Sequence, residues 1–156
     1  MVQSIILEGI TMNETIHLVI DNAVLDEYTK VYFKQHPRAK KPPIKFPYHE
    51  SINVWMIMRR PMMNALKQKW KTFICWFAER QGLANLNIDR CEITQTVYYP
   101  NNRRHDTDNS TPKFILDGLV DGKVIVDDDM RHLTGLHLFC DVDEENPRTE
   151  LEIKIW

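Results

Sequence analysis

The sequence predicts an α+β protein of one domain, in which a mixed β-sheet is packed by two main helices. Alternating apolar residues in Ile16–Ile20, Arg90–Tyr99 and Thr149–Trp156 indicate strands, and Pro61–Arg80 has the three- and four-residue spacing of an amphipathic helix. A chain of 156 residues is most simply one domain with one core. This mixture of patterns favours an α+β fold with a mixed or antiparallel sheet.

Several segments are expected to be strands. Ser4–Leu7 and Ile16–Ile20 could pair through a turn at Met12 and Asn13. Arg90–Tyr99 has the clearest alternation, and the residues on its more apolar face are Cys91, Ile93, Gln95, Val97 and Tyr99. The remaining expected strands are Lys123–Val126, Leu133–Cys140 and Thr149–Trp156.

The long expected helix runs from Pro61 to about Arg80. Pro61 suits the first turn, where a backbone N–H would have no intrahelical partner, and Gly82 suits the end of the helix. The apolar stripe expected to face the core consists of Met63, Leu66, Trp70, Phe73 and Phe77.

A shorter helix is expected to begin at Pro112 and to end near Gly122. Ser110 or Thr111 can cap its N-terminus, because a hydroxyl oxygen accepts from a free N–H of the first turn. Its apolar residues are Phe114, Ile115, Leu116 and Leu119.

The net charge of −2 conceals three segments of different charge. Residues 1–29 carry five acidic residues and no Lys or Arg, whereas residues 30–104 carry fifteen Lys or Arg and four acidic residues. Residues 105–156 carry five Lys or Arg and thirteen acidic residues. This segregation favours a basic surface for a polyanion beside an acidic cluster that gathers cations, although uneven solvated charge would give the same pattern.

Composition also limits the cellular setting. No apolar run reaches the length of a membrane span, and the N-terminus lacks the basic and apolar regions of a secretory leader. Cys75, Cys91 and Cys140 are widely spaced and match no zinc-binding pattern, so reduced core thiols are expected. These observations favour a cytoplasmic protein that does not contact membranes.

The most informative motif is Asp106-Thr107-Asp108-Asn109, which is followed by the acidic run Asp127–Asp129. In an extended segment Asp106 and Asp108 would point to one face, because strand side chains alternate. If the acidic run meets them in space, the repulsion between carboxylates calls for a cation or a shared proton. Carboxylate oxygens favour Mg²⁺, or Mn²⁺, and such sites suit phosphate chemistry.

An EF-hand calcium loop is an alternative for the same segment. Asp106, Asp108 and Asp117 have its spacing, but the glycine that the loop requires is Thr111, and a strand is expected before the motif where an EF-hand has a helix. The EF-hand is therefore disfavoured. Lys113 follows the motif and could stabilise charge on a phosphate, or form a plain ion pair with Asp117 one helical turn on.

Two stretches of the chain, Arg103–Val120 (RRHDTDNSTPKFILDGLV) and Val124–His132 (VIVDDDMRH), resemble the RusA-like Holliday junction resolvases of bacteria and phages. The resemblance covers about residues 50–156, and Ser51–Asn53 with the basic helix after it is similar to the family's substrate-binding region. Residues 1–156 are expected to be one RusA-like domain, in which residues 1–45 are an N-terminal extension. The resemblance implies a bacterial or phage-encoded homodimer that nicks two strands of a four-way DNA junction symmetrically, with divalent metal, in DNA recombination and repair.

The resemblance also assigns site residues by position. Lys113 matches the family's essential lysine, although it is one residue further from the Asp-x-Asp pair than in the most familiar members. Asp128 is favoured over Asp127 as the third acid, and Asp129 is expected to be a neighbour. If the run is extended, Asp127 and Asp129 face away from Asp128. The implied catalytic residues are Asp106, Asp108, Lys113 and Asp128, and the implied Mg²⁺ ligands are Asp106, Asp108, Asp127 and Asp128.

Basic residues around the motif are expected to contact the DNA backbone, because Lys and Arg bind phosphate without reading the bases. Lys67 and Lys71 share a face of the long helix, and an ordinary solvated helix would show the same face. The proline-rich segment Lys34–Pro47 is expected to be a basic loop, with DNA contact and a solvated linker equally open. The residues expected to bind DNA are Asn53, Arg60, Lys67, Lys71, Arg103 and Arg104.

Aromatic and histidine side chains near the motif have two interpretations. Tyr98 and Tyr99 could stack on unpaired bases, although packing within the sheet is the favoured use. His105 and His132 flank the two acidic motifs and could contact phosphate, but ordinary surface histidines are favoured.

Two other functions fit the same residues. A non-catalytic module that binds branched DNA would use the acids for a structural cation or for repulsion, and it would bind without cutting. A flap or replication-fork nuclease would apply the same chemistry to another branched substrate.

Overall fold

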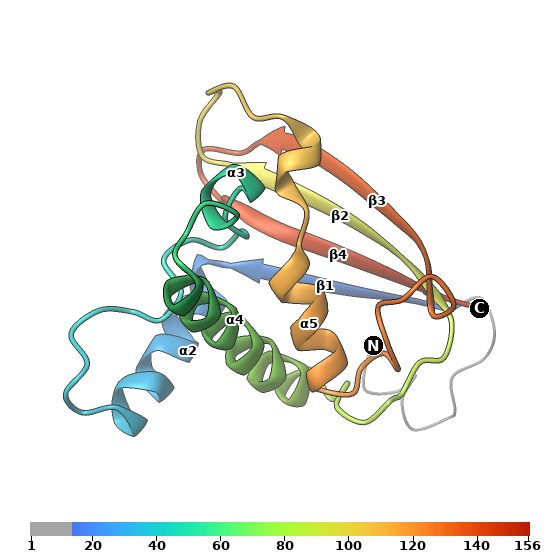
Figure 1. The fold of residues 1–156 in the computed structure, drawn as a ribbon, viewed down its shortest axis with the longest axis horizontal. Helices are drawn as coiled ribbons and strands as arrows, with labels where there is room; N and C mark the ends of the chain where they lie inside the picture. The colour runs from blue at the N-terminus through green and yellow to red at the C-terminus, as the bar shows by residue number, and fades with distance from the viewer. Residues whose placement is uncertain (1–13) are drawn as a thin grey trace.

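Residues 14–156 are described by the computed structural model, and they form a four-stranded mixed sheet covered on one face by helices (Figure 1). The strand order is β1-β4-β2-β3, in which β4 is antiparallel to both neighbours and β2 is parallel to β3. The predicted α+β class with a mixed sheet is therefore confirmed. The strands are β1 (Thr15–Asp21), β2 (Cys91–Tyr99), β3 (Leu133–Val142) and β4 (Arg148–Ile155).

The two main helices that the sequence predicts, α4 and α5, lie across one face of the sheet (Figure 1). Pro112, the predicted first residue of the shorter helix, is instead its N-cap, because its ψ of 54° is not helical. The helices are α2 (Asn22–Gln35), α3 (Ile52–Trp55), α4 (Arg60–Arg80), the short 3-10 helix η1 (Thr107–Ser110) and α5 (Lys113–Asp121).

Residues 123–126 do not form the regular strand that the sequence predicts. Lys123 has a left-handed φ of 56°, which breaks an extended run. Ile125 makes an isolated parallel bridge to Ile88, whose N–H donates to the carbonyl oxygen of Val124 at 3.0 Å. Val124 and Ile125 are both buried, although they are neighbours in the chain. The apolar run therefore reflects burial of an irregular segment.

The extended conformation considered for the Asp-x-Asp motif is not found in the structure. Asp106 has extended dihedrals, but the next four residues form η1. The Thr111 hydroxyl donates to the carbonyl oxygen of Asp108 at 2.8 Å, and the Ser110 hydroxyl donates to that of Thr107 at 2.6 Å. Such local bonds favour a turn over a strand. The alternation that would place both aspartates on one face does not apply here.

The core lies between the sheet and the helices α4 and α5. Trp70, Phe73 and Phe77, from the predicted apolar stripe, are fully buried. Strand β2 buries every second residue along its length, as its alternation predicts. Its central Ile93 is paired with the equally buried Ile153 of β4. Apolar burial on one face of the sheet thus fixes which way each strand faces.

The N-terminal part of the chain belongs to the same sheet. Strand β1 pairs with β4 along its whole length. Tyr28 of α2 is buried against Phe73 of α4, with ring centroids 5.0 Å apart. Residues 15–35, which the sequence places in an N-terminal extension, thus complete the sheet and part of the core. The predicted pairing with Ser4–Leu7 lies outside the described residues.

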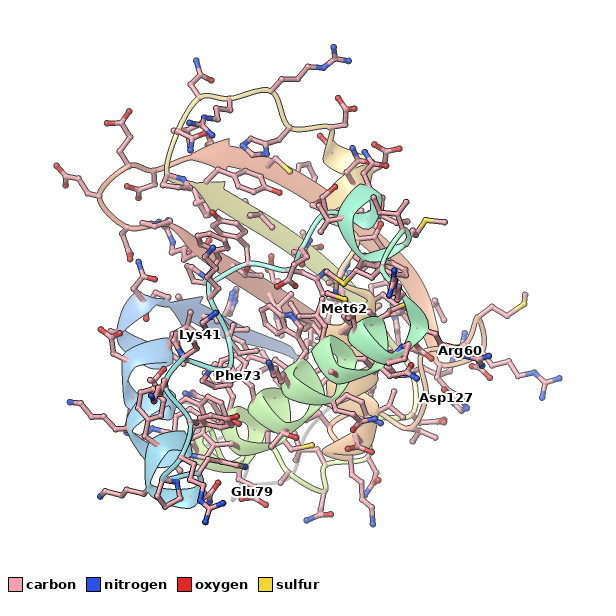
Figure 2. The ribbon with its side chains drawn as sticks, turned by 60° about the vertical axis from the view of Figure 1, so that its left-hand side comes forward. Lys41, Arg60, Met62, Phe73, Glu79 and Asp127 are labelled. Carbon is pink, nitrogen blue, oxygen red and sulfur yellow. The ribbon has the colours of Figure 1, made fainter. Side chains whose placement is uncertain are left out.

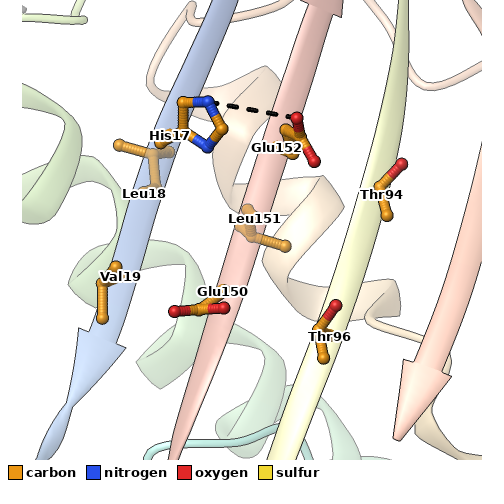
Figure 3. Close-up of a pocket in the computed structure, with 8 residues that line it drawn as sticks. All are labelled: His17, Leu18, Val19, Thr94, Thr96, Glu150, Leu151 and Glu152. Atoms are coloured by element: carbon orange, nitrogen blue, oxygen red, sulfur yellow. Dashed lines mark ion pairs between the residues drawn. The ribbon is translucent and has the colours of Figure 1, made fainter.

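The opposite face of the sheet is mostly polar, although Val19 and Phe139 are also exposed on it. Figure 3 shows a shallow hollow there, formed by β1, β4 and β2, with the helices behind the strands. Nε2 of His17 lies 3.9 Å from Oε1 of Glu152, and both side chains are more than half exposed. An ion pair this exposed adds little stability. The sheet therefore has one core face and one face toward solvent, as antiparallel strand pairs allow.

Gly118 permits the close contact between α4 and α5. A Cβ atom at this position would lie 2.6 Å from Cβ of Ile74, closer than nonbonded carbon atoms approach. Ile74 is fully buried in α4, so it has little room to move. A Cβ atom at Gly135 of β3 would meet the flexible carboxylate of Glu92 instead.

We expect Gly118→Ala to destabilise the protein by about 1–2 kcal/mol. Overpacking costs about 1–3 kcal/mol, and the better helix propensity of alanine offsets up to about 1 kcal/mol of it. Urea denaturation measures the difference, with Gly135→Ala as the control that should stay within about 0.5 kcal/mol of wild type. Equal stability of Gly118→Ala and wild type would contradict this role of Gly118.

Candidate functional site

Both acidic motifs, Asp106–Asp108 and Asp127–Asp129, lie in the connection between β2 and β3. Because these strands are parallel, the chain must cross back along the sheet before β3 begins. The connection, residues 100–132, holds an arginine-containing loop, η1, α5 and the acidic run Asp127–Asp129, in that order. Figure 1 shows it rising beyond the end of β2, crossing the sheet as α5 and returning to the start of β3.

Lys113, the first residue of α5, links that helix to the acidic run. Its Nζ donates to Oδ1 of Asp117 at 3.0 Å and to Oδ2 of Asp128 at 3.3 Å. Nζ of Lys67 in α4 lies 3.7 Å from Oδ2 of Asp117. The Asp117 and Asp128 side chains are only 14% and 24% exposed, so the charges are partly shielded from water. We call these four residues the charge cluster.

The charge cluster keeps Lys113 protonated. Partial burial lowers the pKa of Lys113, but its hydrogen bonds with Asp117 and Asp128 and their negative charges outweigh this effect and raise the pKa above its ordinary value. Lys113 therefore makes the ion pair with Asp117 that the sequence suggested, and it also contacts the acidic run through Asp128. Lys113 is a fixed cation at neutral pH.

The three aspartates of the acidic run have different surroundings, because the run is a turn and not an extended segment. Oδ1 of Asp127 accepts from the N–H of Asp128 at 2.8 Å. Oδ1 of Asp129 accepts from the N–H groups of Arg131 and His132 at 3.0 and 3.1 Å, which closes the turn into β3. Asp128 is the member that reaches the charge cluster. Strand alternation therefore does not decide which aspartate faces the site.

A second set of predicted residues surrounds a hollow beside α3. Nε of Arg104 lies 3.4 Å from Oδ1 of Asp106 at its rim. The structure thus brings Asn53, Arg104 and Asp106, which the sequence predicts separately, to one place. We call it the Asp106 hollow, and its lining residues are Ser51, Asn53, Tyr99, Arg104, His105, Asp106 and Asn109.

Within residues 14–156, no three His, Cys, Asp or Glu side chains are arranged so that they could hold a metal ion. Among these described residues, no such group combines Asp106, Asp108 and Asp128, so their meeting around a metal ion stays a prediction. Mg²⁺ keeps several of its waters and needs only one or two carboxylates. Asp106 and Asp108 are both exposed, so their oxygens are accessible to a hydrated ion. The donor chemistry fits Mg²⁺.

Two of the predicted DNA-contacting residues are engaged between helices. Lys67 belongs to the charge cluster, and Nζ of Lys71 lies 3.6 Å from Oδ1 of Asp121. The basic face of α4 is therefore directed at α5 in this part. Lys67 and Lys71 therefore form ion pairs that join α4 to α5.

The other predicted DNA-contacting residues are open to solvent. Figure 2 shows Arg60 at the start of α4, whose other end carries Glu79, and Lys41 in the loop that follows α2. That loop is irregular, as the sequence predicts for Lys34–Pro47, although Lys34 itself still lies in α2. The exposed members of the predicted set are Asn53, Arg60, Arg103 and Arg104.

His49 is a positioning residue that the sequence does not reveal. Its Nε2 accepts a hydrogen bond from the N–H of Phe114 at 3.0 Å, and its Nδ1 donates to the carbonyl oxygen of Glu50 at 2.7 Å. Phe114 lies in the first turn of α5, where N–H groups have no intrahelical acceptor. His49 therefore caps α5 beside Lys113. No capping motif marks it, because the contact spans 65 residues of chain.

Burial explains why His49 can act as an acceptor. It lowers the pKa of His49 to about 4, against smaller upward effects of the Glu50 carbonyl and the Asp117 charge. The imidazole ring lies nearly parallel to Trp70, with centroids 5.6 Å apart. Nε1 of Trp70 donates to the Glu50 carboxylate at 2.7 Å, whereas burial raises the pKa of Glu50. His49 is thus neutral at pH 7, with a lone pair on Nε2.

We expect His49 to make the stability of the protein depend on pH. Its pKa rises from about 4 when folded to 6.5 when unfolded, so the stability it contributes is present above pH 6.5 and is lost as the pH falls toward 4. The full loss is about 3 kcal/mol. His49→Gln keeps an acceptor for the N–H of Phe114 but does not titrate. Its free energy of unfolding, from urea denaturation, should fall less over this range.

The control for this titration is His36→Gln, which removes an exposed imidazole at the end of α2. It should follow the wild-type dependence on pH. Parallel curves for wild type and His49→Gln would contradict a buried neutral imidazole at position 49.

No protein-family model and no curated protein matches the chain significantly. None of the helices within residues 14–156 has the length and apolarity needed to cross a membrane.

Proposed function

We propose that this chain is a Mg²⁺-dependent, structure-selective endodeoxyribonuclease of the RusA-like type, which resolves four-way DNA junctions as a homodimer. The observation that carries the proposal is the 3.3 Å contact between Lys113 and Asp128. The motif resemblance assigns both residues to one catalytic site, although they are 15 residues apart in the chain. Their contact supports that assignment.

The residues of the proposed site have separable roles. Asp106, Asp108 and Asp128 would hold Mg²⁺, with Asp127 beside them. When bound, Mg²⁺ would supply an activated water and neutralise charge on the phosphate. Lys113 would place a positive charge where negative charge develops during cleavage. Its hydrogen bond to Asp117 restricts where its ammonium group can lie.

Charge and symmetry support a branched DNA substrate. Residues 30–104 carry most of the basic residues, and exposed Arg103 and Arg104 lead directly to Asp106. Such residues bind backbone phosphates without sequence preference. A four-way junction has two-fold symmetry, so a symmetric dimer can present one active site to each of two strands.

A non-catalytic module that binds branched DNA is the second candidate. The observation that favours it is the lack, among residues 14–156, of three clustered side chains that could ligate a metal ion. In this candidate Lys113 neutralises Asp117 and Asp128 as part of the fold. It predicts tight junction binding without strand scission in Mg²⁺ or Mn²⁺.

The first experiment is cleavage of a labelled synthetic four-way junction, with Mg²⁺ and with EDTA, beside flap, fork and linear duplex substrates. We expect paired symmetric nicks in the junction with Mg²⁺ alone. Asp108→Asn and Lys113→Gln should retain junction binding and lower the cleavage rate by a factor on the order of 100 or more, because each removes a group that stabilises developing charge.

The matched controls are Asp26→Asn, which changes an exposed aspartate of α2, and Lys69→Gln, which changes an exposed lysine of α4. Both should cleave as wild type does. Wild-type rates for Asp108→Asn would rule out the assigned site. Binding without scission by the wild type would select the non-catalytic module, and preferred cutting of flaps or forks would select that nuclease class.

The homodimer has a candidate contact surface at α3 and the start of α4. Several apolar side chains there are exposed, and Ile57 is the most exposed at 85%. A monomer rarely leaves such a group of apolar side chains in water. We call these residues the α3–α4 patch: Val54, Met56, Ile57 and Met62.

We expect light scattering to give the wild type twice the 18.5 kDa mass of one chain. Ile57→Lys should shift the protein toward the monomer, because it places a charge in a desolvated contact. Val19→Lys, on the polar face of the sheet, is the control and should remain dimeric. A monomeric wild type would contradict the homodimer, and a dimeric Ile57→Lys would contradict the α3–α4 patch.

A further inference from the structure

An aromatic surface next to Asp106 has no part in the proposed chemistry. The imidazole ring of His105 lies flat on the ring of Tyr99, with centroids 3.7 Å apart and parallel planes. Tyr99 is buried at the end of β2, whereas His105 is exposed. One face of the imidazole therefore rests on a buried ring, while His105 itself is exposed.

The neighbouring tyrosines are not themselves open platforms. The guanidinium carbon of Arg148 lies 3.8 Å from the ring centroid of Tyr98, and this arginine also binds Asp143. Tyr99 is covered by His105. The sequence suggests Tyr98 and Tyr99 for base stacking near the motif, but the exposed ring there belongs to His105.

The Tyr99–His105 pair stands between two hollows. On one side is the Asp106 hollow, with the side chains of Asn53, Arg104 and Asn109. On the other side is a hollow that Arg103 lines together with residues at the end of β3. Both hollows include the stacked pair, so each has an aromatic wall and an arginine.

We infer that His105 is a stacking platform for one unpaired nucleobase of the DNA strand whose phosphate lies at Asp106. This inference rests on the proposed function, because it takes the ligand to be nucleic acid. A base has a flat π-face that stacks on an aromatic ring. The amides of Asn53 and Asn109 offer donors and acceptors to its edge, and Arg104 offers a cation to its phosphate.

The support beneath His105 favours stacking over a simple charge contact. A surface histidine that only neutralised phosphate would need no fixed ring plane. Because Tyr99 already holds the imidazole, little conformational freedom is lost when a base stacks on it. The centre of a four-way junction has unpaired or weakly stacked bases. His105 would stack on one such base in the strand that is bound at Asp106.

The test is binding of a short single-stranded oligonucleotide and of a four-way junction in EDTA, where cleavage does not occur. We expect His105→Ala to weaken binding about 5- to 150-fold, since removing one stacking ring costs about 1–3 kcal/mol. His105→Phe should bind as wild type, and His105→Lys should not restore binding. An abasic nucleotide at one position should weaken wild-type binding and leave His105→Ala unaffected.

The matched control is His17→Ala, which removes another exposed imidazole. His17 lies in β1, on the polar face of the sheet, and it does not line the Asp106 hollow. It should bind as wild type. Wild-type binding by His105→Ala, full rescue by His105→Lys, or no effect of any abasic position would overturn the inference.

Metal-free binding separates this inference from the proposed function. Junction cleavage with unchanged binding by His105→Ala would leave the nuclease standing and remove the platform. Stacking-dependent binding without cleavage would leave the platform standing and remove the nuclease. If the wild type binds neither the oligonucleotide nor the junction, both proposals fail.

Discussion

The parallel pairing of β2 and β3 is the constraint on which the site depends. Two parallel neighbours cannot be joined by a tight turn, so the chain must cross the sheet between them. Here that crossing carries both acidic motifs and the helix α5 between them. The return to β3 brings Asp128 within reach of Lys113 at the start of α5. The charge cluster is thus a result of topology as much as of local sequence.

Helix α5 is held at several points, so its first turn is a firm support for side chains. His49 binds the free N–H of Phe114, and Gly118 lets the middle of the helix touch Ile74 of α4. Lys67 and Lys71 add ion pairs from α4 to the two aspartates of α5. A site on a fixed helix holds its groups more closely than a site on a free loop. The Asp106 hollow lies just before this support, where the backbone is less regular.

Local periodicity was enough to predict β2 and α4, whereas helix α2, which buries Leu25 and Tyr28, was not predicted. The alternation of β2 and the apolar stripe of α4 both reflect burial on one face, and burial leaves a pattern in the sequence. The other features that were not predicted share a different cause. Val124 and Ile125 are buried by contacts with the segment at Ile88, and His49 meets Phe114 across the fold. Such contacts join distant parts of the chain, so no local window contains them.

For the site, the sequence could indicate candidate residues but not how their side chains pair. The motif resemblance and the charge pattern together identified Lys113, Asp128, Asn53, Arg104 and Asp106 as candidates. They could not show that Lys113 would bind Asp117 and Asp128 together, or that Lys67 would share Asp117. Those choices depend on how α4, α5 and the acidic run are placed. The geometry of the turn, and not strand alternation, decides which aspartate of the acidic run meets Lys113.

The pairing of β1 with β4 has a consequence for how the protein is made. Thr15 lies opposite Lys154, so the first described strand meets the last. Among the strands of residues 14–156, β1 pairs with β4 alone, so this pairing waits until β4 has been synthesised. Contacts this distant in sequence slow folding, because most of the chain must be ordered before they form. The sheet therefore closes as one late event, and loss of β4 would leave β1 and β2 without their shared neighbour.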